Sequence, residues 1–494
     1  MVLDFRLRAL ASLQPLRDYI RHNVAHLRSS PCLLISSAPP PGALSTAVAG
    51  TKTPASTKSS SEQQKTQKER LKLQQQQNET RVHSFVERNT QHLTLEFGLR
   101  TVPCRISSAF PTLASVNEAV SLAKRAGLKE GGGPGHGVII GIGSGAAMDL
   151  AKAVADTLFG NISPCEDSHE TIPAGSASLV LAPCTLGGVW AASSNSSISL
   201  LDTKEEILLP YLPIPWRNAS PARRNGTVVT LDPSSHLALP PLYTSFQPVK
   251  RSDYSCAPTM AHVAAAALAI MLDVARSIDM AMKMGTENDA VDLHNRVAKE
   301  IKEVSSLFAS ALELATCDAA NGDGEKSDNH TTLAQQHLLD AIPRLSSVLE
   351  LSSLLANVPM MTAGTLPQKL ANSLLPTYFP QCHLLTFLAS TLPGLCDVLS
   401  ESVSSGRSGS MVGVVAASMT ESSLSSWASR VTMEAGLPSM ANLAYGTPDV
   451  NTLVGALDSY EALMASLKSG GVTYGRGRDD QWLMEDVLKR SLLR

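Results

Sequence analysis

The stretch from Gly137 to Asp156 constrains the fold more than any other part of the sequence. It reads Gly-Val-Ile-Ile-Gly-Ile-Gly-Ser-Gly-Ala-Ala-Met-Asp-Leu-Ala-Lys-Ala-Val-Ala-Asp. A β-branched strand pattern runs through a Gly/Ser turn directly into an Ala-rich helix pattern. Such a turn presents unpaired backbone N–H groups and the positive end of a helix, so a phosphate can bind there. The stretch fits neither of the two standard nucleotide-binding patterns, GxGxxG with a later acid and GxxxxGK[ST]. A strand, a glycine turn and a helix in this order are also common in proteins where the turn binds no ligand.

Short apolar runs bounded by turn residues predict further strands, and helical spacing of apolar residues predicts two helices in the same half. The strands are expected at Cys32–Ile35, Ala177–Ala182 and Gly226–Leu231, and the helices at Leu7–Ile20 and Ser115–Arg125. The strand at 177–182 ends in a loop of mostly small residues, Pro183–Gly188. Ligands of open parallel sheets lie at this carboxyl edge.

Strand patterns disappear after about residue 255, and long Ala/Leu/Met-rich helical patterns replace them. Helices are predicted over Thr259–Ser277, Asp292–Ala315 and Leu333–Ala356, with several more up to Arg494 and exposed loops at Asn321–Asn329 and Ser404–Ser410. Strands with helices, followed by helices alone, predict the fold class α/β + all-α. We expect an α/β domain over residues 1–240 and an all-α domain over residues 241–494.

One segment of the first domain has a different composition. Residues 38–80 contain Pro39-Pro40-Pro41, a Thr/Ser/Lys-rich stretch and four consecutive glutamines from Gln74. Such a low-complexity segment cannot bury enough apolar surface to fold, so a disordered insert is expected over about residues 38–90. It is either a docking segment or a tolerated surface insertion. We predict that residues 41–90 are dispensable for folding.

Charge and hydropathy exclude two classes of partner. The 41 Lys and Arg residues against 44 Asp and Glu residues give a net charge of −3. The sequence therefore has no overall basic field for nucleic acid or an anionic membrane. The longest apolar run, Val263–Val274, is shorter than a membrane span and contains Asp273. We expect neither nucleic acid nor membrane as a partner.

The eight cysteines are scattered, without a CxxC pair or a zinc-ribbon spacing. The N-terminus has no signal-peptide core. Reduced, buried thiols in an intracellular, cytoplasmic protein are expected. A mitochondrial transit peptide is the alternative for the Arg-rich N-terminus, although Asp4, Asp18 and the strand that follows argue against it.

Several stretches, taken in chain order, match the pattern of one family. They are Leu10–Ser37 (helix, then strand), Gly143–Lys152 (GGGSxxDxAK), Pro183–Ala191 (PTTxGTGSE, poorly), Val228–Pro233 (strand ending in Asp-Pro) and Gly436–Pro438 (Gly-Leu-Pro). The chain resembles the iron-type alcohol dehydrogenase superfamily, with its glycerol dehydrogenases and maleylacetate reductases, from near Leu10 to the C-terminus without the insert. The resemblance implies a Rossmann-like domain for NAD or NADP and a helical domain with a divalent metal, Fe or Zn. It also implies hydride transfer in the cleft between the domains, between the nicotinamide and a small alcohol or ketone.

The metal site is where the sequence departs from the family. The first ligand pair is an Asp and a His four residues apart, and here Pro258 replaces the Asp while His262 remains. The third ligand position is taken by Gln368, the fourth by His383, and Asn372 stands where many members have a further His. His262, His383 and one amide are a weak set for iron or zinc. Either histidine can instead be an ordinary packed residue.

Two residues nearby, Asp253 and Cys256, are possible replacement ligands. Without a metal, the resemblance leaves His262 and His383 as candidate catalytic residues that hydrogen-bond to the substrate oxygen. Maleylacetate-reductase-like members are thought to work without metal.

The cofactor side keeps part of the family pattern. The resemblance assigns cofactor binding to the turn residues Gly143, Ser144 and Gly145, and to Asp149 and Thr185. Ser37 replaces the acid that holds the adenosine ribose, which makes NADP as acceptable as NAD. We expect an NAD(P)-dependent oxidoreductase, with a homodimer possible. The alternative is an inactive relative that keeps the fold as a binding or regulatory protein.

Overall fold

The computed structural model describes more than half of the chain. The described residues are 16, 18, 20–21, 30–37, 91–106, 110–129, 137–159, 179–183, 188, 191–192, 198–204, 206–211, 227–229, 260–282, 290–320, 324–355, 365–379, 382, 384–404, 410–419, 423–443, 449–466 and 477–493. The prediction of a dispensable segment at 41–90 lies outside these residues and stays a prediction.

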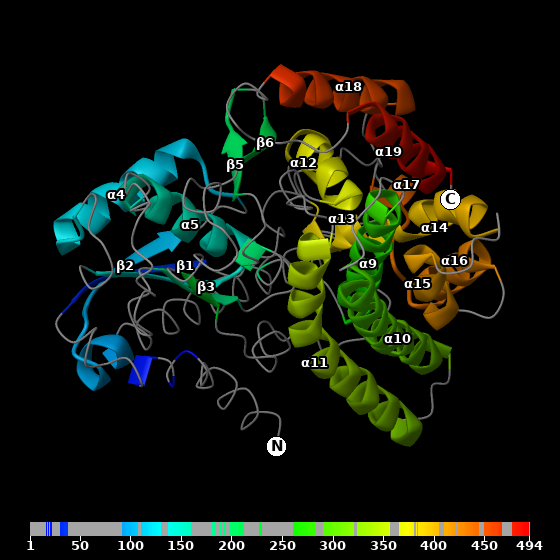
Figure 1. Cartoon of the computed structure of the whole chain (residues 1–494), viewed down its shortest axis with the longest axis horizontal. Coiled ribbons are helices and arrows are strands. Elements are labelled where there is room, and N and C mark those ends of the chain that lie inside the picture. Colours follow the sequence, from blue (N-terminus) through cyan, green and yellow to red (C-terminus); the bar gives the residue numbers. More distant parts are fainter. Residues whose placement is uncertain are drawn as a thin grey trace, which may run out of the picture.

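A parallel five-stranded sheet organises the N-terminal part (Figure 1). Its strands are β1 (Pro31–Ser37), β2 (Arg100–Ile106), β3 (Val138–Gly143), β4 (Leu179–Pro183) and β7 (Thr227–Val229). Their order in the sheet is β2-β1-β3-β4-β7. The register places Ser36 of β1 opposite Arg105 of β2 on one side and Ile142 of β3 on the other. Four of these strands were predicted from the sequence; β2 was not.

Both faces of the sheet are buried, which explains why its central strands are almost continuously apolar. Leu33, Ile35 and Ile139 pack on one face against α4 (Leu113–Ala126) and α5 (Gly145–Phe159). The alternate residues of the same strands face the other side, where they pack with Leu16, Ile20, Leu93 and Phe97. Leu93 lies in a short π-helix, η1 (His92–Glu96).

All the described elements from residue 260 onward are helices. They are α9 (Met260–Met282), α10 (Ala290–Ala320), α11 (Gly324–Leu355), α12 (Leu366–Tyr378), α13 (Leu384–Ser390), α14 (Leu392–Ser404), α15 (Met411–Met419), α16 (Leu424–Glu434), α17 (Met440–Leu443), α18 (Val450–Ser466) and α19 (Gly477–Leu492). The predicted fold class, α/β + all-α, is therefore confirmed. The loop expected at Asn321–Asn329 is wrong in part, because α11 already begins at Gly324.

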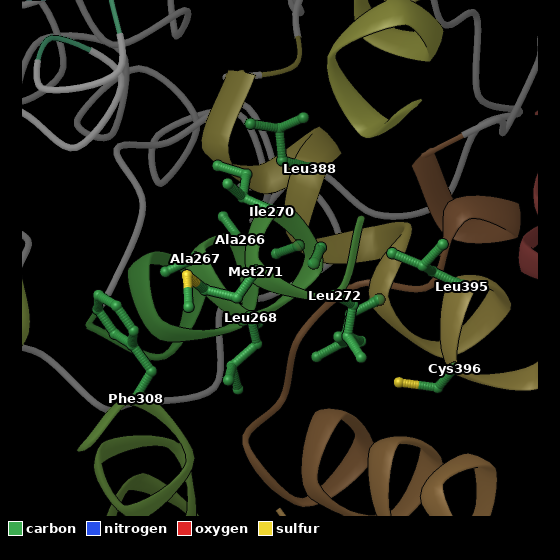
Figure 2. Packing of buried hydrophobic residues seen from close by; sticks show 14 of the residues in the cluster. Ala266, Ala267, Leu268, Ile270, Met271, Leu272, Phe308, Leu388, Leu395 and Cys396 are labelled. Atoms are coloured by element: carbon green, nitrogen blue, oxygen red, sulfur yellow. The ribbon is translucent and has the colours of Figure 1, made fainter. Parts of the chain in front are cut away.

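Helix α9 is the centre of the helical part. Its Leu268, Met271 and Leu272 are completely buried among side chains of the neighbouring helices, including Phe308 of α10 and Leu395 of α14 (Figure 2). Small residues on α9, such as Ala266 and Ala267, let these neighbours approach closely. Helix α9 therefore forms the core on which the other helices are assembled.

One described helix is longer than the apolar run identified in the sequence. Among the described residues, Met260–Met280 is long and apolar enough to cross a membrane, with 21 residues and a mean hydropathy of 1.5. However, 89% of its most apolar window is buried inside the protein, as in a core helix. Asp273 does not interrupt α9, because Arg276 and the Leu366 N–H donate hydrogen bonds to its carboxylate, each at 2.7 Å.

A two-stranded antiparallel hairpin was not expected from the sequence. It consists of β5 (Ile198–Asp202) and β6 (Ile207–Tyr211). On one side, the Leu201 N–H donates to the Pro111 carbonyl at 2.8 Å, next to the N-cap of α4. On the other side, the Thr377 hydroxyl of α12 donates to the Glu206 carbonyl at 2.8 Å. The hairpin thus contacts both the sheet domain and the helical part.

Candidate active site

The order of the strands determines where a ligand can bind. By position, β2-β1-β3-β4-β7 is the doubly wound order 2-1-3-4-5. The chain leaves β1 toward one edge of the sheet and leaves β3 toward the other. In open α/β sheets, ligands bind outside the carboxyl ends of the strands at such a switch point. Ser36 and Ser37 end β1, and Gly143 ends β3. Four of the cofactor residues expected from the sequence, Ser37, Gly143, Ser144 and Gly145, therefore lie at one point of the sheet.

The turn after β3 has the backbone geometry of an anion site. Gly143 has φ +127°, a conformation that residues with a Cβ rarely adopt. Ser144 begins the helix, since its carbonyl accepts the Ala147 and Met148 N–H groups at 3.1 and 3.2 Å. The N–H groups of Gly145 and Ala146 consequently have no acceptor within α5, and the first turn contains no acidic residue. These groups fit a pyrophosphate.

Gly141 brings the helix close to the strand that carries the turn. A Cβ on Gly141 would lie 2.9 Å from the Ala151 Cβ and 3.2 Å from a Leu181 methyl carbon. Only glycine therefore allows α5 to pack this closely against β3 and β4. The close packing fixes the direction in which the first turn of α5 points.

Asp149, expected to bind cofactor, has its partners inside the protein. It is 7% exposed, and its Oδ1 lies 3.7 Å from the Nζ of Lys152, which is 1% exposed. Burial raises the pKa of Asp149 to about 7, although the charge of Lys152 and a hydrogen bond from the Ser199 N–H act to lower it. Burial also lowers the pKa of Lys152 to about 8, although the charge of Asp149 acts to raise it. Because Ser199 belongs to β5, the buried pair of Asp149 and Lys152 connects the hairpin to α5, the helix that follows the Gly143–Gly145 turn.

The structure places the candidate ligands on two different helices. His262 lies near the start of α9 and is 4% exposed, among apolar neighbours such as Met260 and Val263. Gln368 lies in the first turn of α12, and its amide N–H donates to the Asn372 Oδ1 at 3.1 Å. Thr185 and His383 lie outside the described residues, as do Asp253 and Cys256.

Asp273 fixes α12 against α9. The N-cap residue of α12, Thr365, makes no side-chain capping bond, and the buried carboxylate of Asp273 accepts the first N–H of the helix, from Leu366. The negative charge also stabilises the positive end of the helix. Gln368 is two residues further along, so its position is set by a contact between the two candidate ligand helices.

The donor set does not fit a tight iron or zinc site. Proline replaces the carboxylate at position 258, and the third position has a neutral amide that is bonded to Asn372. Lys369, the next residue, is 6% exposed and adds a cationic side chain to the same helix. Within the described ranges, no three His, Cys, Asp or Glu residues are grouped as metal ligands. No catalytic step is therefore derived through a metal.

Three of the described cysteines are thiols of low reactivity. Burial raises the pKa of Cys32 and Cys382 to about 12 and that of Cys104 to about 11. A thiol with such a pKa carries almost no thiolate at neutral pH and is a poor nucleophile. Cys382 precedes His383 directly, but it does not supply a reactive sulfur to that position.

Comparisons with known proteins give likeness in overall structure only. No family model and no curated protein matches the sequence. A structure of 1,3-propanediol oxidoreductase is 14% identical, covers 81% of this chain and 88% of its own, and has a TM-score of 0.47. The iron-containing alcohol dehydrogenase from Corynebacterium glutamicum is 12% identical, with 97% and 92% covered and a TM-score of 0.46. The sulfoacetaldehyde reductase from Bifidobacterium kashiwanohense, in complex with NAD+, is 12% identical, with 91% and 88% covered and a TM-score of 0.47.

These similar structures include members of the iron-containing alcohol dehydrogenase family, which is the family that the sequence motifs resemble. The fold agrees with the class expected from the order of strands and helices.

Sequence reasoning missed three groups at this site. The partner of Asp149 is Lys152, and its i, i+3 spacing on a predicted helix was a usable signal. Arg105 lies beside Ser36 only because β2 pairs with β1, and β2 was not predicted. The contact of Ser199 with Asp149 depends on the β5–β6 hairpin, whose residues show no clear alternation of apolar and polar side chains.

Proposed function

We propose that this protein is an NAD(P)-dependent oxidoreductase of the iron-type alcohol dehydrogenase kind. It would transfer a hydride between the nicotinamide and a carbon of a small alcohol or ketone. The observation that carries the proposal is the position of the Gly143–Gly145 turn at the switch point between β1 and β3. The motif resemblance over the rest of the chain supports it.

The residues of the turn fit a dinucleotide. The Gly145 and Ala146 N–H groups would hold the pyrophosphate, and Gly143 lets the phosphate approach the backbone. The nicotinamide, when bound, supplies the hydride acceptor or donor. Asp149, Lys152 and Ser199 keep the helix and the hairpin together beneath this site.

The substrate side relies on the helical part. The proposal assigns His262, and His383 by resemblance, to hydrogen-bond the alcohol or carbonyl oxygen. An imidazole that donates to this oxygen stabilises the negative charge that develops on it as the carbonyl is reduced. Since Pro258 and Gln368 leave an incomplete ligand set, this assignment needs no metal.

Cofactor titration tests the proposal directly. NADH and NADPH would be titrated in parallel into the full-length protein, by tryptophan fluorescence and by calorimetry. Saturable binding of at least one reduced cofactor, followed by its oxidation with small aldehydes or ketones, is expected. Absence of binding of either cofactor at millimolar concentration would refute the proposal.

A second candidate function is a non-catalytic relative that keeps the fold. The observation in its favour is the bond between Gln368 and Asn372, which occupies amide groups at two positions of the family's histidines. Such a protein would bind a dinucleotide without oxidising or reducing any substrate. A reduced cofactor that stays bound and unreacted across a broad panel of carbonyl compounds distinguishes this candidate from the enzyme.

A further inference from the structure

Two polar side chains are adjacent at the carboxyl end of the sheet, beside the candidate pyrophosphate turn. In the parallel register, Ser36 of β1 pairs with Arg105 of β2. Cys104 and Ile106 pack on the face covered by α4 and α5, so Arg105, which lies between them, points to the opposite face. Ser36 alternates with Ile35 in the same way and lies on that opposite face too. The two residues therefore lie side by side on the same face of the sheet.

The Ser36 hydroxyl indicates that this place is built for a polar group. Ser36 is 2% exposed, and in the described structure its Oγ has no hydrogen-bond partner. A buried hydroxyl without a partner is destabilising, so native proteins rarely retain one. An oxygen of a bound ligand would satisfy it. Arg105, by contrast, is exposed.

The two strands carry no acidic residue. Strand β1 contains no Asp or Glu. Strand β2 has two arginines and no acid. Glu118 of α4 influences the Cys104 thiol, which lies on the other face of β2 from Arg105. NAD-binding sites of this general kind use a carboxylate on the ribose 2′-hydroxyl, whereas an arginine accommodates a 2′-phosphate.

The strand order places these groups where an adenosine ribose would lie. The pyrophosphate turn follows β3, and β1 and β2 are the next strands toward that edge of the sheet. Each step between neighbouring strands is about 4.8 Å. A ribose attached to a pyrophosphate at the turn would reach the end of β1, and β2 is the next strand beyond it. Arg105 is the long cationic side chain at that end of β2.

We propose that the cofactor is a 2′-phosphorylated dinucleotide, NADP(H), whose 2′-phosphate is bound by Arg105 with a hydrogen bond from the Ser36 hydroxyl. This inference rests on the proposed function and specifies its cofactor. Arginine is suited to the role because its planar fork donates two parallel hydrogen bonds to phosphate oxygens. The site discriminates by charge, because NADH offers no group to the arginine.

The test compares NADPH with NADH, and adenosine 2′,5′-bisphosphate with 5′-ADP, on the full-length protein. The unmodified protein is expected to bind NADPH at least tenfold more tightly than NADH. Arg105→Gln should weaken the binding of NADPH and of the 2′,5′-bisphosphate by roughly tenfold to a hundredfold. The affinity for NADH should stay unchanged. Arg100→Gln is the matched control, since Arg100 is an exposed arginine at the other end of the same strand. Ser36→Ala should weaken the binding of NADPH by a smaller factor than Arg105→Gln does.

The outcomes separate this inference from the proposed function. Equal affinity for NADPH and NADH, or a preference for NADH, overturns the inference and leaves the oxidoreductase standing. A preference for NADPH that survives Arg105→Gln overturns the assignment to Arg105. An equal loss of both cofactors in Arg105→Gln, with an altered melting temperature, shows a structural role and also overturns it. If neither cofactor binds to the unmodified protein, both proposals fall.

Discussion

The turn after β3 and the helices α9 and α12 match the pattern that the sequence resembles to different extents. The turn after β3 retains its glycines, its helix start and its position at the switch point. The pair of helices α9 and α12 retains the packing, anchored by Asp273, but has a proline and an amide at two ligand positions. The backbone arrangement is present in both regions, whereas the ligand helices lack two of the side chains that a metal site of the resembled pattern needs.

The difference follows from what each kind of site is made of. A pyrophosphate site consists of backbone N–H groups and a helix end, which any sequence that folds correctly will provide. A metal site consists of particular side chains, and each replacement removes a ligand. A fold can therefore keep the first kind of site while it loses the second. The following variants test whether the two regions are as independent as this comparison implies.

The largest effect is expected at the buried pair beneath the turn. Lys152→Met would leave the Asp149 carboxylate buried without its counter-charge, at a cost of about 3–5 kcal/mol in the free energy of unfolding. The double variant Asp149→Asn/Lys152→Met should be clearly more stable than Lys152→Met alone. Urea denaturation followed by circular dichroism measures both.

An exposed pair serves as the matched control. On α19, the Lys489 Nζ lies 3.1 Å from the Glu485 Oε2, and the Lys489 side chain is 48% exposed. Lys489→Met should change the free energy of unfolding by less than about 1 kcal/mol. If Lys152→Met costs no more than Lys489→Met, the pair does not anchor the turn.

The second effect concerns cofactor binding at the turn. Gly145→Val should weaken NAD(P)H binding by more than about a hundredfold, because the new side chain would lie where the phosphate approaches the helix end. Gly455→Val on α18 is the control, since a Cβ there meets nothing within 4 Å. Calorimetric titration gives the affinities, and melting curves check the fold. An unchanged affinity in Gly145→Val would place the pyrophosphate elsewhere.

How much the sequence predicted depended on the range of the interactions involved. The strand–turn–helix at Gly137–Asp156 was predictable, because glycine spacing and apolar periodicity are local signals. The burial of Asp149 was not, since it depends on Ser199 of a hairpin that showed no clear alternation. The neighbourhood of Ser36 and Arg105 likewise depends on pairing between strands far apart in the sequence. The capping of α12 by Asp273 could not be predicted either, since 93 residues separate Asp273 from Leu366.

A third, smaller effect is a pH dependence of stability. Between pH 4 and 7 the unfolded chain has lost the Asp149 proton while the folded chain retains it, so stability falls as pH rises. Between pH 8 and 10.5 the unfolded chain keeps the Lys152 proton that the folded chain has lost, so stability rises again. The difference in free energy of unfolding between the unmodified protein and Asp149→Asn/Lys152→Met should therefore be least favourable to the unmodified protein near pH 7–8. A difference that does not vary with pH contradicts the shifted pKa values.

The smallest expected effect is that of removing metal. With Pro258 and Gln368 at two ligand positions, the purified protein should carry substoichiometric iron and zinc, and any dehydrogenase activity should survive a chelator.

Pro258→Asp/Gln368→His introduces a carboxylate and an imidazole at these two positions. It should raise the metal content toward one ion per chain, because α9 and α12 remain fixed to each other through Asp273 and Leu366. Gln336→His, on α11, is the control for an added histidine. Elemental analysis of the three proteins measures the outcome. One tightly held metal in the unmodified protein would show that Asp253, Cys256 or another group completes the site, and that the ligand helices have kept their chemistry after all.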